Sequence, residues 1–139
     1  MDNDIKLSQC FVTVDDADKA LGFYRDALGL EVRDDVGHGG MRWVTLGSPA
    51  QPDVAVVLEP PLPDPNASEA DRRAVTDLLA KGLLRGAIFS TEDVDATFER
   101  IRSAGFEVLQ EPVDQHYGVR DCAFRDPAGN MIRFARSTA

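Results

Sequence analysis

A chain of 139 residues, 43% of them hydrophobic, has the size of one domain and enough apolar side chains for a core. Its formal net charge of −9 disfavours nucleic acid and anionic membrane surfaces as partners. The longest apolar run, residues 54–58, is far shorter than the ~20 residues that cross a bilayer, so no membrane association is expected.

The compartment is predicted from the N-terminus and the cysteines. Residues 1–4 are acidic and lack the basic and apolar regions of a signal peptide. Cys10 and Cys122 both lie in strand-like runs, and we expect two buried, reduced thiols rather than a disulfide or a nucleophile. Together these features predict a cytoplasmic protein.

The chain contains an internal duplication. Residues 12–18 return in similar form at residues 89–95, so that Asp16 matches Asp93 at a shift of 77 positions. Each copy begins as an apolar strand, passes through acidic residues and opens a helix that ends at a glycine. Self-similarity of this kind predicts two half-modules, neither of which buries its hydrophobic face alone.

The first strand, residues 7–14, alternates in character. Positions 10, 12 and 14 form an apolar face suited to packing against helices. Gln9, Phe11 and Thr13 form a mixed face suited to the wall of a cavity. The strand therefore predicts a sheet with one core-facing side and one side open to a ligand.

The first half continues as a helix, a short strand, a loop and two further strands. Asp16 is the expected N-cap of the helix and Gly29 its stop. Trp43 lies on a strand and either lines the cavity or packs in the core, which is the more common place for a large aromatic side chain. The expected ranges are 16–28 for the helix, 30–33, 41–46 and 53–59 for the strands, and 36–40 for the loop.

A connector follows the first half. Residues 60–65 contain four prolines and cannot form a regular element. Ser68 and Asp71 have the spacing of a capping box, which predicts a helix that ends at Gly82. This helix either simply joins the halves or covers one mouth of the cavity.

The second half repeats the first. We expect a strand at 86–91, a helix at 94–104, a strand at 106–110, a polar loop at 111–118, and a hairpin of strands 119–125 and 131–136 around the turn 126–130. The predicted fold class is α+β. Residues 1–139 form one domain, divided into a first module (5–60), a proline-rich linker plus helix (61–84) and a second module (85–137).

Residues 14–16, 23–30, 92–95 and 126–130 resemble motifs of the vicinal oxygen chelate superfamily, which includes glyoxalase I, bleomycin-resistance proteins and extradiol dioxygenases. The resemblance spans both halves of the chain. It implies two βαβββ modules whose mixed sheets curl around a cleft, assembled as a homodimer.

The resemblance also implies where a metal would lie. Enzymes of the superfamily hold a divalent metal, acting as a Lewis acid, with four side chains from the first and last strands of each half. Carried over, these positions are Gln9, Ala55, Gly86 and Arg133. Only Gln9 is a suitable ligand type, and a guanidinium would repel a dication. We therefore expect no metal and no other cofactor.

The leading hypothesis is a small-molecule-binding protein of this superfamily. A metal-dependent lyase, isomerase or dioxygenase is the alternative, and a metal-independent enzyme using Gln9, His116 or Tyr117 for proton transfer is a third. Arg133 pairs either with a carboxylate or phosphate of an anionic ligand or with one of the chain's own carboxylates. The predicted ligand-binding residues are Gln9, Phe11, Trp43, Val57, Ile88, His116, Tyr117, Arg120 and Arg133. Of these, His116, Tyr117 and Arg120 are expected at the rim of the cavity.

Overall fold

Two four-stranded mixed sheets form the frame of the protein, in a computed structural model that describes residues 3–137. Their strand orders, β1-β4-β3-β2 and β5-β8-β7-β6, are equivalent, and the fold is α+β as predicted. The elements are β1 (Gln9–Thr13), α1 (Ala17–Leu21), η1 (Gly22–Ala27), β2 (Glu31–His38), β3 (Met41–Gly47), β4 (Ala55–Glu59), α2 (Glu69–Ala80), β5 (Ala87–Ser90), α3 (Val94–Ser103), β6 (Glu107–Asp114), β7 (Val119–Arg125) and β8 (Met131–Ser137).

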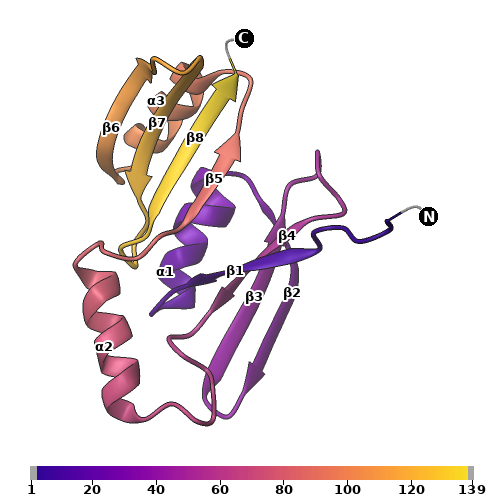
Figure 1. The fold of residues 1–139 in the computed structure, drawn as a ribbon, viewed down its shortest axis with the longest axis vertical. Coiled ribbons are helices and arrows are strands. Elements are labelled where there is room, and N and C mark those ends of the chain that lie inside the picture. Colours follow the sequence, from indigo (N-terminus) through magenta and orange to yellow (C-terminus); the bar gives the residue numbers. More distant parts are fainter. Residues whose placement is uncertain (1–2, 138–139) are drawn as a thin grey trace.

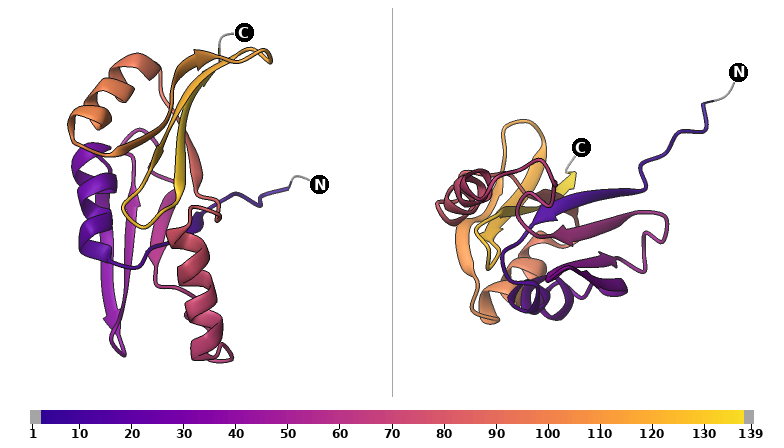
Figure 2. Two further views of the ribbon diagram at one scale, coloured as in Figure 1. Left: turned by 90° about the vertical axis from the view of Figure 1, so that its left-hand side faces the viewer. Right: turned by 90° about the horizontal axis from the view of Figure 1, so that it is seen from below.

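The two modules are stacked along the long axis of the molecule (Figure 1). Helices α1 and α3 lie on the same side, one above the other, with the sheets behind them (Figure 2). The segment before β1 projects away from the body, and α2 stands beside the first module (Figure 1). Among the described residues, no helix has the length and apolar character that a membrane crossing requires. Residues 1–2 of the acidic N-terminus lie outside the described residues.

The duplication predicted from the sequence is confirmed at both ends of the module helices. Asp16 and Asp93 are N-caps whose carboxylates accept hydrogen bonds from Lys19 N at 3.1 Å and Ala96 N at 2.9 Å. Gly105 ends the second helix with φ of +95°, a conformation that favours glycine. The predicted capping box of the connector helix α2 is also present.

The first helix widens after its first turn into the π-helical segment η1. Leu28 N donates to Phe23 O, five residues back, at 2.9 Å. The consecutive residues Phe23 and Tyr24 of this segment are both fully buried. Helix α3, which has no such turn, buries its residues at ordinary helical spacing.

One hydrophobic core joins the two modules. Phe23 of η1 meets Phe106, just before β6, edge to face with ring centroids 5.0 Å apart. Arg100 of α3 donates to Ala27 O at 3.1 Å, which ties the two helices together. The expectation that neither half-module buries its hydrophobic face alone agrees with this shared core.

A buried polar network also crosses between the modules at the predicted turn 126–130. Tyr24 donates its hydroxyl to Asp126 Oδ2 at 2.6 Å, and burial together with this carboxylate raises the tyrosine pKa well above its ordinary value. Asp126 Oδ1 accepts from three backbone amides of its own turn. Asn130 donates to Thr13 O at 2.8 Å, so the turn is fastened to the first strand of the other module.

Two predicted loops are largely strands. β2 extends to His38 and β6 to Asp114, so the first residues of the predicted loops 36–40 and 111–118 belong to strands. The register continues to the pair His38 and Met41, leaving only Gly39 and Gly40, both at positive φ, as the turn. Glycines and polar residues are tolerated because the whole of β2 and most of β6 are exposed outer strands of their sheets.

The expectation for the cysteines is half wrong. Cys122 is fully buried, and this burial raises the pKa of its thiol to about 11. Cys10 is exposed, because β1 is an outer strand whose first residues extend beyond the shared core. Neither cysteine forms a disulfide.

Candidate functional site

Each sheet has one face packed against the helices and an opposite face, which we call the helix-free face. In the first sheet, Val12 and Leu58 belong to the core. Because neighbouring residues of a strand alternate in direction, Phe11 and Val57 point to the helix-free face. They lie opposite each other in the register, and Thr45 of β3 extends the same row.

The second sheet is built in the same way. Ile132 and Phe134 of β8 belong to the core, so Arg133 between them lies on the helix-free face. Its register partners are Ile88 of β5 and Ala123 of β7, and Gln110 of β6 completes the row. Two of the predicted ligand-binding residues, Ile88 and Arg133, are therefore neighbours, as are Phe11 and Val57 in the first sheet.

Large apolar side chains are exposed on both helix-free faces. The exposed fraction is 59% for Phe11 and 70% for Ile88. Val57 is buried but stands outside the core cluster, as expected for a side chain covered by its neighbours on the helix-free face. Exposed aromatic and aliphatic side chains on the open face of a sheet are typical of a surface that receives a ligand or partner.

Trp43 lies on the helix-free face rather than in the core. It is partly exposed, absent from the core cluster, and separated by alternation from the buried Val44. The expectation of core packing is therefore wrong, because Val44 and Leu46 already occupy the core-facing positions of β3. The other reading of the sequence, an aromatic on the cavity wall, agrees with this position.

Arg133 is held by side chains of its own sheet. Its Nη1 donates to Gln110 Oε1 at 3.0 Å and forms an ion pair with Asp121 Oδ2 at 3.2 Å. The side chain of Asp121 is only 2% exposed and that of Arg133 is 22% exposed. Two partners of Arg133 were considered from the sequence, an anionic ligand and a carboxylate of the chain, and the structure contains the second.

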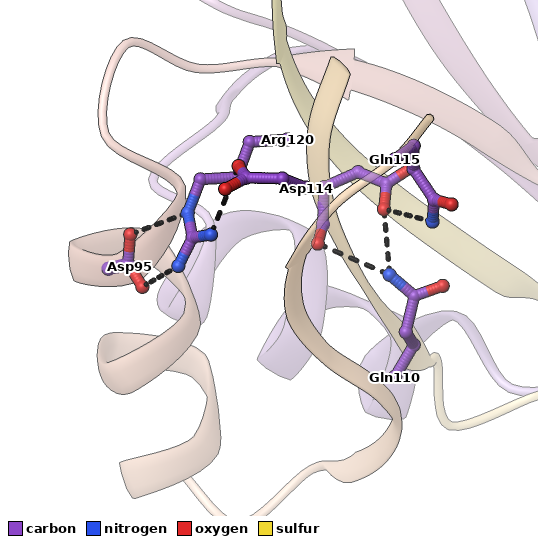
Figure 3. Close-up of polar contacts among 6 residues, drawn as sticks. Asp95, Gln110, Asp114, Gln115 and Arg120 are labelled. Carbon is purple, nitrogen blue, oxygen red and sulfur yellow. Dashed lines mark hydrogen bonds and ion pairs between the residues drawn. The ribbon is translucent and has the colours of Figure 1, made fainter. Parts of the chain in front are cut away.

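Asp121 is the centre of this network. Gln110 and Gln115 donate to its Oδ1 at 2.7 and 3.0 Å; both glutamines are visible in Figure 3. Burial by itself raises the pKa of Asp121, but the hydrogen bonds from Gln115 and Gln110 and the charge of Arg133 outweigh it and hold the pKa below its ordinary value. The carboxyl group of Asp121 is therefore ionised at neutral pH.

Arg120 lies on the opposite side of the sheet. Its guanidinium binds both carboxylate oxygens of Asp95 on α3, at 3.0 and 2.7 Å, and Asp114 at 3.2 Å (Figure 3). Because Arg120 directly precedes Asp121 on β7, the two side chains point to opposite faces. Arg120 thus fastens a helix to the sheet, and its assignment to the cavity rim is corrected.

His116 and Tyr117 occupy the turn between β6 and β7. Their rings contact each other edge to face with centroids 5.1 Å apart, and Tyr117 is 61% exposed. Gln115, the residue before them, reaches the buried Asp121. The turn therefore starts beside the Arg133 network, although within residues 3–137 neither aromatic residue shares a hydrogen bond with Arg133 or Gln9.

Asp121, Gln110 and Gln115 were not predicted as site residues from the sequence. A signal for Asp121 was present, because this carboxylate stands beside Cys122, Ala123 and Phe124 in a strand-like run. A carboxylate in a buried strand requires an ionic or hydrogen-bonded partner. The two glutamines carried no comparable signal, because their common partner, Asp121, lies on the neighbouring strand β7 and this pairing is not visible in the sequence.

The family's metal positions do not fit a metal ion. Gly86 cannot be exchanged for a ligand in this backbone, because a Cβ there would meet the backbone oxygen of Met131. The register places Arg133 opposite Ile88 rather than Gly86. Gln9 lies opposite Ala55. Glu59, the nearest carboxylate on β4, is four residues further along the strand and about 13 Å from Ala55. Within residues 3–137, no three His, Cys, Asp or Glu side chains gather in a way that suits a metal.

An open hollow of about 570 Å³ lies between the modules. Cys10 and Val56 line it from the first sheet, Val54 from the segment before β4, and Ile88, Phe89 and Ala135 from the second sheet. Ile88 therefore belongs both to this hollow and to the row that contains Arg133. The volume is within the range of small-molecule sites in proteins.

Comparison with known proteins agrees with the arrangement of the two modules. Residues 6–134 match the model of the Glyoxalase/Bleomycin resistance protein/Dioxygenase superfamily. The chain belongs to this superfamily. The match includes both sheets and the connector between them, so the predicted family and fold are confirmed.

Individual relatives cover nearly the whole chain. The uncharacterized protein YurT of Bacillus subtilis (strain 168) is 30% identical over 132 residues, which are 95% of this chain and 99% of YurT. The crystal structure of UcmS2 is 37% identical with a TM-score of 0.85, covering 96% of this chain and 98% of UcmS2. The structure of TnmS3, an antibiotic binding protein from Streptomyces sp. CB03234, is 27% identical with a TM-score of 0.73, covering 96% of each chain.

Proposed function

We propose that this superfamily member binds a small organic molecule on its helix-free faces and does so without the metal centre of the family's enzymes. The observation that carries the proposal is the combination of exposed apolar side chains, Phe11 and Ile88, with three metal positions whose residues cannot ligate. TnmS3, described as an antibiotic binding protein, supports a ligand of antibiotic-like size and character for this chain.

The chemistry of the donor positions supports binding rather than metal catalysis. A Lewis-acid centre needs several oxygen, nitrogen or sulfur ligands at fixed distances. Ala55 and Gly86 have no such atoms, and Arg133 carries a positive charge that is engaged with Asp121. Gln9 alone cannot hold a divalent ion against water.

We also propose that a second copy of the chain completes the cleft. Phe11 and Ile88 each expose more than half of their surface in one chain, which is unfavourable in water. A cytoplasmic location forms part of the proposal, because Cys10 and Cys122 are unpaired thiols and reduced cysteines are usual in that compartment.

Elemental analysis tests the proposal directly. Protein purified without chelators should contain far less than one equivalent of zinc, nickel, iron or manganese. Native mass spectrometry of the same sample should detect a bound small molecule by its added mass. Titration with apolar aromatic probes should change the fluorescence of Trp43. A stoichiometric divalent metal would overturn the proposal and favour the alternative, a metal-dependent lyase, isomerase or dioxygenase.

A further inference from the structure

The guanidinium of Arg133 uses only part of its hydrogen-bonding capacity inside the protein. Nη1 is engaged by Gln110 Oε1 at 3.0 Å and Asp121 Oδ2 at 3.2 Å. Nη2 has a weak contact with the Met131 sulfur at 3.8 Å. Within residues 3–137, no acceptor is bound to Nε. The Nε–Nη2 edge therefore remains available for a ligand.

The electrostatic setting of this edge is close to neutral. The carboxylate of Asp121, 2% exposed, lies directly beside the guanidinium and balances its charge. Gln110 and Gln115 fix that carboxylate in place. The chain as a whole carries −9, which adds to the disadvantage of an incoming anion.

The surroundings of the edge are apolar. Ile88, 70% exposed, and the buried Ala123 are the direct register partners of Arg133 on either side. A ligand lying on this row meets hydrocarbon on both sides and a fixed pair of N–H donors between them. In such a setting a ligand oxygen gains a charge-assisted hydrogen bond without the large desolvation cost of a carboxylate or phosphate.

We propose that the Nε–Nη2 edge of Arg133 is a specificity-determining donor for an uncharged oxygen acceptor, such as a ketone or amide carbonyl, on an otherwise apolar ligand. This inference rests on the proposed small-molecule-binding function and names its ligand class. It replaces the expectation that Arg133 recognises a carboxylate or phosphate. Asp121, Gln110 and Gln115 act as positioning residues that hold the guanidinium and neutralise it.

Three naphthalenes of similar size separate the possible modes of recognition. 2-Acetylnaphthalene offers a carbonyl, 2-ethylnaphthalene has no acceptor, and 2-naphthoate carries a negative charge. Binding to the full-length protein is measured by NMR titration with ¹⁵N label, including the Nε resonance of Arg133. We expect the acetyl compound to bind about tenfold more tightly than the ethyl compound, as one hydrogen bond to a charged donor provides. The naphthoate should bind no more tightly than the acetyl compound.

Substitutions identify the residue responsible. Arg133→Met should abolish the preference for the acetyl over the ethyl compound and leave the affinity for the ethyl compound similar. Arg133→Lys keeps the charge but loses the planar fork of donors, and should lose most of this preference. Asp121→Asn should raise the affinity for 2-naphthoate about tenfold or more, because the arginine charge is then unbalanced. Arg120→Met is the matched control, since Arg120 lies on the opposite face, and should leave all three affinities unchanged.

The outcomes distinguish the inference from the function on which it rests. Equal affinities for the acetyl and ethyl compounds, or an unchanged preference in Arg133→Met, overturn the inference while the apolar binding function stands. Strongest binding of 2-naphthoate, lost in Arg133→Met, restores anion recognition and also overturns it. If none of the three compounds shifts resonances of the helix-free faces at millimolar concentration, both the inference and the proposed function fail.

Discussion

At the scale of single residues, two buried carboxylates in the described part of the chain, Asp121 and Asp126, have different partners. Asp126 is bound by backbone amides, Tyr24 and Asn130, all neutral donors. Asp121 is bound by two glutamines and the cation Arg133. A buried charge is tolerated only when it is hydrogen-bonded or paired, and both sites obey this rule. The first carboxylate fastens the modules together, and the second orients a side chain on the helix-free face.

Tyr24 tests the importance of the network between the modules. Tyr24→Phe removes a hydroxyl that donates to Asp126 at 2.6 Å in a fully buried setting. We expect a loss of about 1–3 kcal/mol in the free energy of unfolding, measured by urea denaturation. The same change at the exposed Tyr117 is the control and should cost less than about 0.5 kcal/mol. Equal effects at the two tyrosines would refute the structural role of the network.

Cys122 provides a pH-dependence with a defined sign. Its folded pKa is raised from 9.0 to about 11, so the folded protein keeps a proton that the unfolded chain loses. This contribution to stability is complete below pH 9 and is lost as the pH rises toward 11. The free energy of unfolding, measured by urea denaturation, should fall less between pH 8 and pH 10.5 in Cys122→Ala than in the wild-type protein. Cys10→Ser, a change at an exposed cysteine, should keep the wild-type decrease.

At the scale of elements, each module fastens its helix to its sheet with one arginine and two aspartates. In the first module, Arg42 of β3 binds Asp18 of α1 at 2.8 Å and Asp35 of β2 at 2.7 Å. In the second, Arg120 of β7 binds Asp95 of α3 and Asp114 of β6. The matched geometry shows that the duplication extends to ion pairs outside the core.

These ion-pair triads should make similar, salt-sensitive contributions. Arg42→Met and Arg120→Met are each expected to lower the melting temperature slightly, because the side chains are partly exposed and water screens the charges. The difference from the wild-type protein should shrink in 1 M NaCl. The arginines lower the pKa values of Asp35 and Asp95, so the contribution is present above the ordinary carboxyl pKa and is lost as the pH falls below about 4. A melting-temperature difference that is insensitive to salt would contradict this account.

The sequence predicted the kinds of elements well and their ends less well. The caps Asp16 and Asp93 are local signals, because an N-cap needs only the next turn of the helix. The extent of β2 and β6 is not local, since each is set by the strand with which it pairs. The π-turn of η1 was not predicted either, and its residue Phe23 packs against Phe106 of the other module, a contact that the sequence does not reveal.

At the scale of the whole molecule, the two modules share one core but leave two apolar faces uncovered. If a second copy covers them, as proposed, a charge at the centre of either face should prevent association. Phe11→Asp and Ile88→Asp are expected to shift the protein from dimer to monomer in size-exclusion chromatography with light scattering. Leu83→Asp, also at an exposed apolar residue, is the control and should remain dimeric. A wild-type protein that is monomeric at high concentration would exclude this assembly.

The sequence alone determined the duplicated α+β fold and the absence of ligand-type side chains at Ala55 and Gly86, because these depend on periodicity, caps and residue identity. It also indicated the family through the resemblance of its motifs. Only the tertiary structure decided what Arg133 and Arg120 do. Adjacent residues of a strand face opposite ways, so Asp121 points to Arg133 while Arg120 points to the helix α3. Partners of this kind lie on different strands and helices, far apart in the chain, and become visible only when the strands are in register.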